Sequence, residues 1–150
     1  MKKFLQKKLK NEKGLTLVEL LAVIVILGII AAIAVPAIGN IIENTKYNAV
    51  KADAINALNA ANMYYSENTK TPEAGITVET LVEDGYLENK GKLTVAMTIA
   101  KSSEKKVTIN GTSEEYAGGK TVTFNTATLD DINSDEQKGS KSGNKTLPAS

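Results

Sequence analysis

Residues 12–28 read EKGLTLVELLAVIVILG, and this stretch decides how the rest of the chain is organised. A basic segment ends at Gly14, an apolar run begins at Leu15, and one carboxylate, Glu19, interrupts that run. An ionised side chain in a segment that enters lipid is costly and usually has a partner or a function. The stretch therefore raises two questions: what the glycine does at the border, and what the carboxylate pairs with.

The apolar run continues without a charged residue from Leu20 to Ile42. As a helix, these 23 residues rise roughly 34 Å, enough to cross a hydrocarbon core of about 30 Å. Residues 1–14 hold six Lys and one Glu, and such a basic start predicts a cytoplasmic N-terminus. The sequence thus predicts a single-pass precursor in the cytoplasmic membrane, with the main body of the chain outside the cytoplasm.

The composition argues against several classes of function. The chain of 150 residues has no Cys and no His, which excludes disulfides and Ser-His or Cys-His catalysis and disfavours a zinc site. A glycine-rich phosphate loop of the G-x-x-x-x-G-K type is also absent. Phe4 is the only aromatic residue among the N-terminal lysines, so no direct nucleic-acid site is evident. We therefore expect no enzyme, no cofactor and no metal.

The apolar run has three interpretations. It is an ordinary membrane anchor, or a signal peptide cut at the A-x-A-like sequence Ala32-Ile33-Ala34, or the segment that follows a leader cut before it. Glu19 favours the third interpretation, because a plain anchor has no need of a carboxylate and a signal peptide is weakened by one. The apolar pattern also continues past Ala34 to Ile42.

The octapeptide Lys13-Gly14-Leu15-Thr16-Leu17-Val18-Glu19-Leu20 resembles the N-terminal signature of type IV prepilins and pseudopilins. That signature is a basic leader ending in Gly, then an apolar or aromatic residue, Thr, an apolar pair and Glu. The family most often has Phe where this chain has Leu15. The resemblance implies that a membrane prepilin peptidase cuts between Gly14 and Leu15 and methylates the new Leu15 amine. It also associates Thr16 and Glu19 with assembly.

The pairing of Glu19 follows from electrostatics once cleavage is assumed. Cleavage creates a positive amine at Leu15, which a subunit carries toward Glu19 of a neighbour or toward its own. In a lipid-free core of packed apolar helices, removing one partner of such a pair costs about 3–5 kcal/mol. Glu19 is therefore predicted to fix the register of assembly. The alternative interpretation is that the Glu19 carboxylate extends to the membrane interface and has no partner.

The apolar helix is predicted to continue beyond the membrane to about Ser66. Gly28 and Pro36 interrupt the apolar run and predict a local kink, because proline removes a backbone donor and clashes one turn back. After Ile42 an apolar stripe recurs at helical spacing and should carry a globular head. Its residues are Tyr47, Val50, Ala54, Leu58, Ala61 and Tyr65.

The rest of the head is predicted to be a small antiparallel sheet of 3–4 strands packed by one face on the long helix, an α+β fold. Thr77 is expected to cap a short helix that Gly85 closes. Alternating apolar residues predict strands near 92–100, 105–110 and 120–126, with a fourth at 112–117 as an alternative. The pairs Asn110-Gly111 and Gly118-Gly119 predict turns.

The domain plan is a leader at 1–14, a membrane and filament-core helix at 15–42, a head at 43–129 and a flexible polar tail at 130–150. The tail contains Asp131, Asn133 and Asp135, the opening spacing of a calcium loop, but Glu136 stands where that loop needs Gly. Major pseudopilins resemble one another in carrying calcium near their C-terminal loops. The alternative, a solvated acidic tail, is favoured.

The expected function is that of a structural subunit of a type IV pilus-like filament. The resemblance implies as partners further copies of the chain, the prepilin peptidase, and an assembly platform with its ATPase, with the mature chain in an extracellular filament. One alternative is a pseudopilin of a type II secretion or competence DNA-uptake system. A second is a monomeric, membrane-anchored binding domain outside the cytoplasm.

Overall fold

The structure, a computed structural model, describes residues 2–68, 72, 74–102 and 104–148, with side chains from Thr16 onward. Its helices are α1 (Lys2–Glu67), α2 (Val78–Glu83) and α3 (Leu129–Asn133). Its strands are β1 (Ile76–Thr77), β2 (Thr98–Lys101), β3 (Val107–Thr112), β4 (Val122–Ala127) and β5 (Lys145–Leu147). The chain forms two compact units, Met1–Gly39 and Asn40–Ser150.

The first unit is the N-terminal part of α1. Its large apolar side chains from Leu17 to Ile38 are between 52% and 70% exposed, so the residues that the structure describes leave most of their surface uncovered. The helical stretch Thr16–Glu67 is the one described helix that is long and apolar enough to cross a membrane by length and composition. The predicted apolar helix is therefore present, and its apolar surface is exposed.

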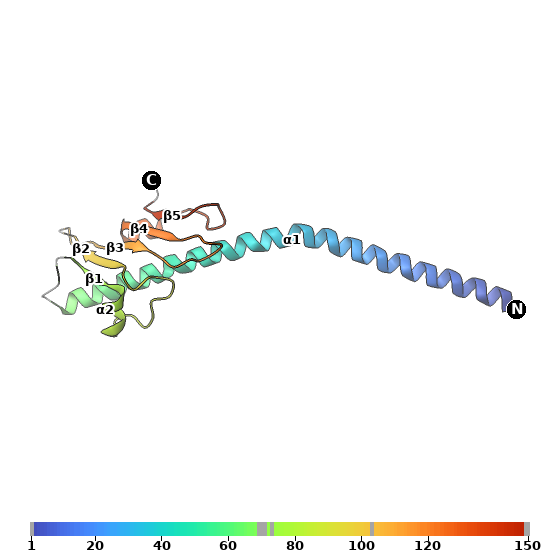
Figure 1. Cartoon of the computed structure of the whole chain (residues 1–150), viewed down its shortest axis with the longest axis horizontal. Coiled ribbons are helices and arrows are strands. Elements are labelled where there is room, and N and C mark those ends of the chain that lie inside the picture. The colour runs from blue at the N-terminus through green and yellow to red at the C-terminus, as the bar shows by residue number, and fades with distance from the viewer. Residues whose placement is uncertain (1, 69–71, 73, 103, 149–150) are drawn as a thin grey trace. The chain divides into compact units, whose positions relative to one another are not determined.

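In the second unit, the rest of α1 lies along one face of the sheet (Figure 1). The six residues of the predicted stripe, from Tyr47 to Tyr65, are each no more than 8% exposed, which confirms the stripe. Ala54, Ala57 and Ala61 are fully buried, and their small side chains let the sheet approach the helix closely. Near the end of α1, the Tyr65 hydroxyl donates to the Ile99 carbonyl oxygen at 2.7 Å and ties the helix to β2.

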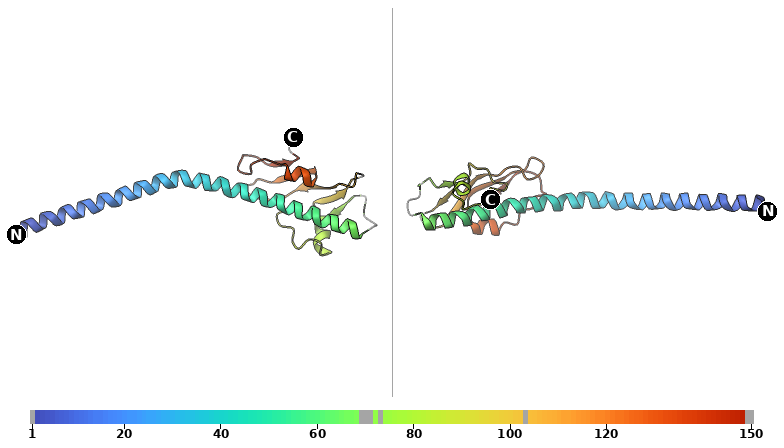
Figure 2. Two further views of the ribbon diagram at one scale, coloured as in Figure 1. Left: turned by 180° about the vertical axis from the view of Figure 1, so that it is seen from behind. Right: turned by 90° about the horizontal axis from the view of Figure 1, so that it is seen from below.

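The sheet has five strands in the order β1-β2-β3-β4-β5, so the predicted number of 3–4 was too low. The first four strands pair antiparallel, and β5 pairs parallel to β4. Figure 2 shows the strands from behind and from below, beside the C-terminal part of α1. The two missed strands, β1 and β5, have only two and three residues, too few to show a period of two.

The predicted strand over 92–100 is wrong in its first half, since β2 begins only at Thr98. Leu93 and Met97 are buried, but Val95 between them is 43% exposed. Two tight turns replace the strand, with the Leu93 and Met97 amides bonded back to the carbonyls three residues earlier. The carbonyl oxygens of Val95 and Met97 instead accept from the first amides of α2, which have no partner within that helix.

The predicted turn at Asn110-Gly111 is also wrong, because both residues lie inside β3. Gly111 has a φ of +132° beside a shift in strand register, and a Cβ there would lie 2.7 Å from Met97 Cγ. The glycine thus permits a β-bulge and a close approach, not a chain reversal. The alternative strand at 112–117 does not form beyond Thr112. The predicted Gly118-Gly119 turn is present.

Residues 130–148 are not the flexible tail that their polar composition predicts. They hold most of α3 and all of β5, and Ile132 and Leu147 are fully buried. α3 begins at a capping box, in which the Thr128 hydroxyl accepts from the Asp131 amide and the Asp131 carboxylate accepts from the Thr128 amide. This segment therefore belongs to the head.

Candidate functional site

The predicted cut lies inside a helix. Gly14 and Leu15 fall within α1, and their side chains lie outside those that the structure describes. A peptidase must extend the backbone to reach the bond between them, which means unwinding the helix locally. Glycine lowers that cost, because in a helix interior it is about 1 kcal/mol less favourable than alanine. The predicted processing point is thus a place where the helix opens easily.

Glu19 is exposed and forms no ion pair with any residue that the structure describes. It stands four residues after Leu15, and side chains at this spacing share one face of a helix. Cutting before Leu15 would make that residue the N-terminus of α1, so its amine would lie within reach of Glu19. Its sequence neighbours Leu17, Val18, Leu20 and Leu21 are themselves 59–67% exposed.

α1 is continuous at both positions of the predicted kink. Gly28 and Pro36 lie inside the helix, and a Cβ on Gly28 would meet nothing within 4 Å. Pro36 has no amide hydrogen, so the carbonyl of Ala32 lacks its usual helical donor. The kink stays a prediction, with a missing hydrogen bond at Pro36 as its physical basis.

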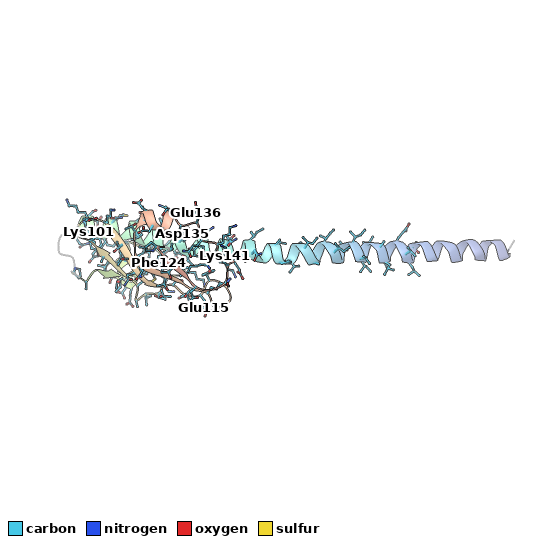
Figure 3. The ribbon with its side chains drawn as sticks, turned by 90° about the horizontal axis from the view of Figure 1, so that it is seen from above. Lys101, Glu115, Phe124, Asp135, Glu136 and Lys141 are labelled. Atoms are coloured by element: carbon cyan, nitrogen blue, oxygen red, sulfur yellow. The ribbon has the colours of Figure 1, made fainter. Side chains whose placement is uncertain are left out.

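A polar cluster in the second unit was not predicted from the sequence. The Asp135 carboxylate accepts through Oδ2 from the Tyr47 hydroxyl at 2.7 Å and from Lys51 Nζ at 3.0 Å. Its Oδ1 accepts from Gln137 Nε2 at 2.9 Å. The Asp135 side chain is 1% exposed and that of Lys51 is 14% exposed. This cluster ties the C-terminal segment, residues 135–142, to α1. Figure 3 labels Asp135, Glu136 and Lys141 of this segment among the side chains of the head.

The electrostatics of the cluster are set by burial and by its hydrogen bonds. Burial pushes the pKa of Asp135 upward, but the hydrogen bonds from Tyr47, Gln137 and Lys51 together outweigh it and the pKa is lowered. Burial, followed by the hydrogen bond to Asp135, raises the pKa of Tyr47. At neutral pH the Asp135 side chain is therefore a carboxylate and the Tyr47 side chain a neutral phenol.

The head is expected to lose stability in acid. A carboxyl group whose pKa is lowered by folding contributes stability above its unfolded pKa of about 3.9, and loses that contribution as the pH falls through the folded value. Asp135 and Asp131 both have lowered pKa values, the latter mainly through hydrogen bonds from Thr128. Melting temperatures followed by circular dichroism should therefore be flat near neutral pH and fall below about pH 4.

Two variants test whether Asp135 contributes to this fall of the melting temperature in acid, called the acid limb below. Asp135→Asn should lower the melting temperature at neutral pH and make the acid limb shallower, because one of the two carboxylates is gone. Glu136→Gln changes the exposed neighbour, which forms no ion pair among the described residues, and should leave the limb unchanged. An acid limb in Asp135→Asn as steep as that of the unmodified chain would contradict the assignment.

Comparison with known proteins addresses the N-terminal features. Residues 9–35 match the model of a family described as the prokaryotic N-terminal methylation motif. The chain carries a prepilin methylation motif. The matched residues include Gly14, Thr16, Glu19 and Gly28, while Pro36 lies just outside them. The resemblance to the type IV prepilin and pseudopilin family is thereby confirmed.

A relative extends the likeness beyond the prepilin motif. The chain is 34% identical over 92 residues to a Pseudomonas aeruginosa protein named type II secretion system core protein G. The alignment covers 53% of this chain and 65% of that relative. No solved structure matches the chain.

Proposed function

We propose that this chain is a structural subunit of a type IV pilus-like filament, processed between Gly14 and Leu15 and polymerised through the N-terminal part of α1. The observation that carries this proposal is the uncovered apolar surface from Leu17 to Ile38, directly after a prepilin motif. Such a surface is stable in lipid, or against copies of itself. The precursor would use the first environment and the filament the second.

Glu19 supplies the register in this proposal. In the membrane precursor it lies near the interface, where water reaches the carboxylate. In a filament core it would be enclosed by apolar helices, and only the Leu15 amine of a neighbouring or the same subunit would neutralise it. A wrong stagger leaves a buried charge unpaired, at a cost of about 3–5 kcal/mol. The apolar helices thus supply affinity, and the charge pair selects one arrangement.

The partners of this subunit would be copies of itself, a prepilin peptidase, and an assembly platform with its ATPase. The peptidase would act on the cytoplasmic side, where the basic leader lies. The platform would extract the cleaved chain from the membrane into an extracellular filament. In this scheme the peptidase carries out the cleavage and the methylation, and the chain is its substrate. The chain itself contributes its shape, its apolar surface and the Glu19 carboxylate to assembly.

A pseudopilus of a secretion system is the second candidate, favoured by the name of the Pseudomonas aeruginosa relative. Both candidates require a polymer, so one experiment separates them from a monomeric anchored domain. The chain is expressed in a host that supplies an assembly system, and sheared surface fractions are viewed by electron microscopy with an antibody to the head. Labelled fibres are the expected result, and labelled material confined to membrane monomers would overturn the proposal. Fibre length then separates a surface pilus from a short pseudopilus.

A further inference from the structure

Five backbone carbonyl groups of the C-terminal segment are bound by the ammonium groups of three lysines. Lys51 Nζ lies 2.8 Å from the Asp135 carbonyl oxygen. Lys120 Nζ lies 3.2 Å from the carbonyl oxygen of Gly139 and 3.4 Å from that of Ser140. Lys145 Nζ lies 3.0 Å from the carbonyl oxygen of Lys141 and 3.3 Å from that of Ser142.

The three lysines reach the segment from different parts of the head. Lys51 is on α1, Lys120 follows the Gly118-Gly119 turn, and Lys145 is in β5. The side chains of Lys51 and Lys120 are 14% and 15% exposed, and Lys145 is 5% exposed. These ammonium groups are therefore enclosed, and each is bound by oxygen atoms that hold it in one place.

Two of these lysines also bind a carboxylate. Lys51 Nζ lies 3.0 Å from Asp135 Oδ2, and Lys120 Nζ lies 2.7 Å from Glu43 Oε2. Each of these two cations is thus surrounded by a carboxylate oxygen and one or two carbonyl oxygens. This is the set of ligands that Ca²⁺ prefers in proteins, here gathered around an ammonium group.

Two further hydrogen bonds hold the segment, one to α1 and one to the loop before the Gly118-Gly119 turn. The Asn44 Oδ1 atom accepts from the Ser140 amide at 2.9 Å, and the Tyr116 hydroxyl donates to the Gly139 carbonyl oxygen at 3.1 Å. A Cβ on Gly139 would lie 2.4 Å from Tyr47 Cβ and 2.8 Å from the Glu43 carbonyl oxygen. The segment therefore fits α1 only with glycine at this position.

The carboxylates of the calcium-like sequence do not fit a metal. Asp131 Oδ2 accepts from the amide and hydroxyl of Thr128 at 2.8 and 2.6 Å, at the start of α3. Both oxygens of Asp135 are occupied by the Tyr47, Lys51 and Gln137 donors. Within the described part of the chain, no group of three or more His, Cys, Asp or Glu residues is placed to hold a metal ion. Three of the carboxylate oxygens that calcium would need as ligands, Asp131 Oδ2 and both oxygens of Asp135, are thus bound by other partners.

We propose that the ammonium groups of Lys51, Lys120 and Lys145 replace a calcium ion in this head. They gather the carbonyl oxygens of the C-terminal segment and fasten the segment to α1 and to the sheet. The head therefore folds to the same stability with and without calcium. This inference concerns the second unit alone and does not rest on the proposed filament function.

The first test uses the unmodified full chain in detergent micelles. Its melting temperature is measured by circular dichroism in excess EGTA and in millimolar CaCl₂ at equal ionic strength. The expected result is the same melting temperature in both. If the head had a calcium site, free calcium at a hundred times the dissociation constant would raise the melting temperature by roughly 10 °C. A rise of that size would overturn the proposal.

The second test removes one cation. Lys51→Met keeps most of the apolar stem and should lower the melting temperature by about 10 °C, because Asp135 is left buried without its cation. Calcium should not restore it. Lys46→Met, on the same helix at an exposed lysine with no ion pair among the described residues, is the matched control. Equal melting temperatures for the two variants would overturn the proposal. The EGTA comparison needs no variant and decides the matter even if Lys51→Met does not fold.

Discussion

Replacing Gly14 with glutamate is expected to keep the leader on the chain, so that no product beginning at Leu15 forms. The bond between these residues lies in a helix that must open for a peptidase, and glycine makes that opening easy. A glutamate side chain at the cut restores helix propensity and places bulk and negative charge where an extended backbone has to enter a narrow cleft. Misplacing a reacting bond by about 1 Å can cost 100-fold in rate, and a loss of at least that size is expected.

Intact-mass spectrometry of the membrane fraction measures this outcome. The Gly14→Glu chain should appear at the mass that begins at Met1, and the unmodified chain at the mass that begins at Leu15. Asn11→Glu adds the same charge three residues earlier and keeps Gly14, so it should still be cut. A Gly14→Glu product that begins at Leu15 would show that the cleavage assignment is wrong.

Replacing Glu19 with alanine is expected to leave cleavage intact and to abolish most assembly. The cut lies five residues away, and Glu19 makes no ion pair among the described residues that cleavage would need. Each subunit would then bury its Leu15 amine without a carboxylate, at a cost of about 3–5 kcal/mol per contact. That cost lowers the association constant by 100-fold or more.

The measurement is the amount of head antigen in sheared fibres relative to the mature chain in the membrane. Glu19→Asp keeps the charge on a shorter side chain and should retain part of the assembly. Glu19→Gln keeps the shape without the charge and should fail like alanine. Normal fibre yield from Glu19→Ala or Glu19→Gln would remove the charge pair from the account.

The sequence predicted best the parts of the fold in which hydrophobic periodicity is strong. The helix from Thr16 to Glu67 follows from a continuous apolar run and then from a stripe at spacings of three and four. Two strands follow from short alternations, Val107 with Ile109 and Val122 with Phe124, each pair buried on one face of the sheet. In each case the residues that define the pattern also form the core.

The sequence failed where polar contacts between distant residues fix the chain. Residues 130–150 have few apolar side chains, so composition predicts a flexible tail. Its residues 135–142 are held instead by Lys51, which lies 84 residues from Asp135 in the sequence, and by Lys120. Lys120 also binds Glu43, which lies 77 residues away. Such pairs leave no periodic signal. The segment around Val95 shows the opposite error, a regular structure predicted where none forms. Its residues alternate as in a strand, but they form turns whose carbonyl groups accept from the amides of α2.

At the candidate site, the motif around Gly14 and Glu19 was readable because its chemistry requires particular residues at fixed spacing. The three lysines of the C-terminal segment were not readable, because an enclosed ammonium group looks like any other lysine in a sequence. One signal pointed to them in part. The calcium-like spacing at Asp131, Asn133 and Asp135 begins in α3 and ends at a carboxylate that binds a cation, and this cation is Lys51.

The N-terminus of the assembled chain tests the central claim most directly. Fibres sheared from the cell surface are identified by electron microscopy, and the chain within them is analysed by mass spectrometry. The account predicts fibres whose subunits begin at Leu15 and carry a methyl group on the new amine. Subunits that begin at Met1, or a secreted monomer that begins at Val35, would contradict it.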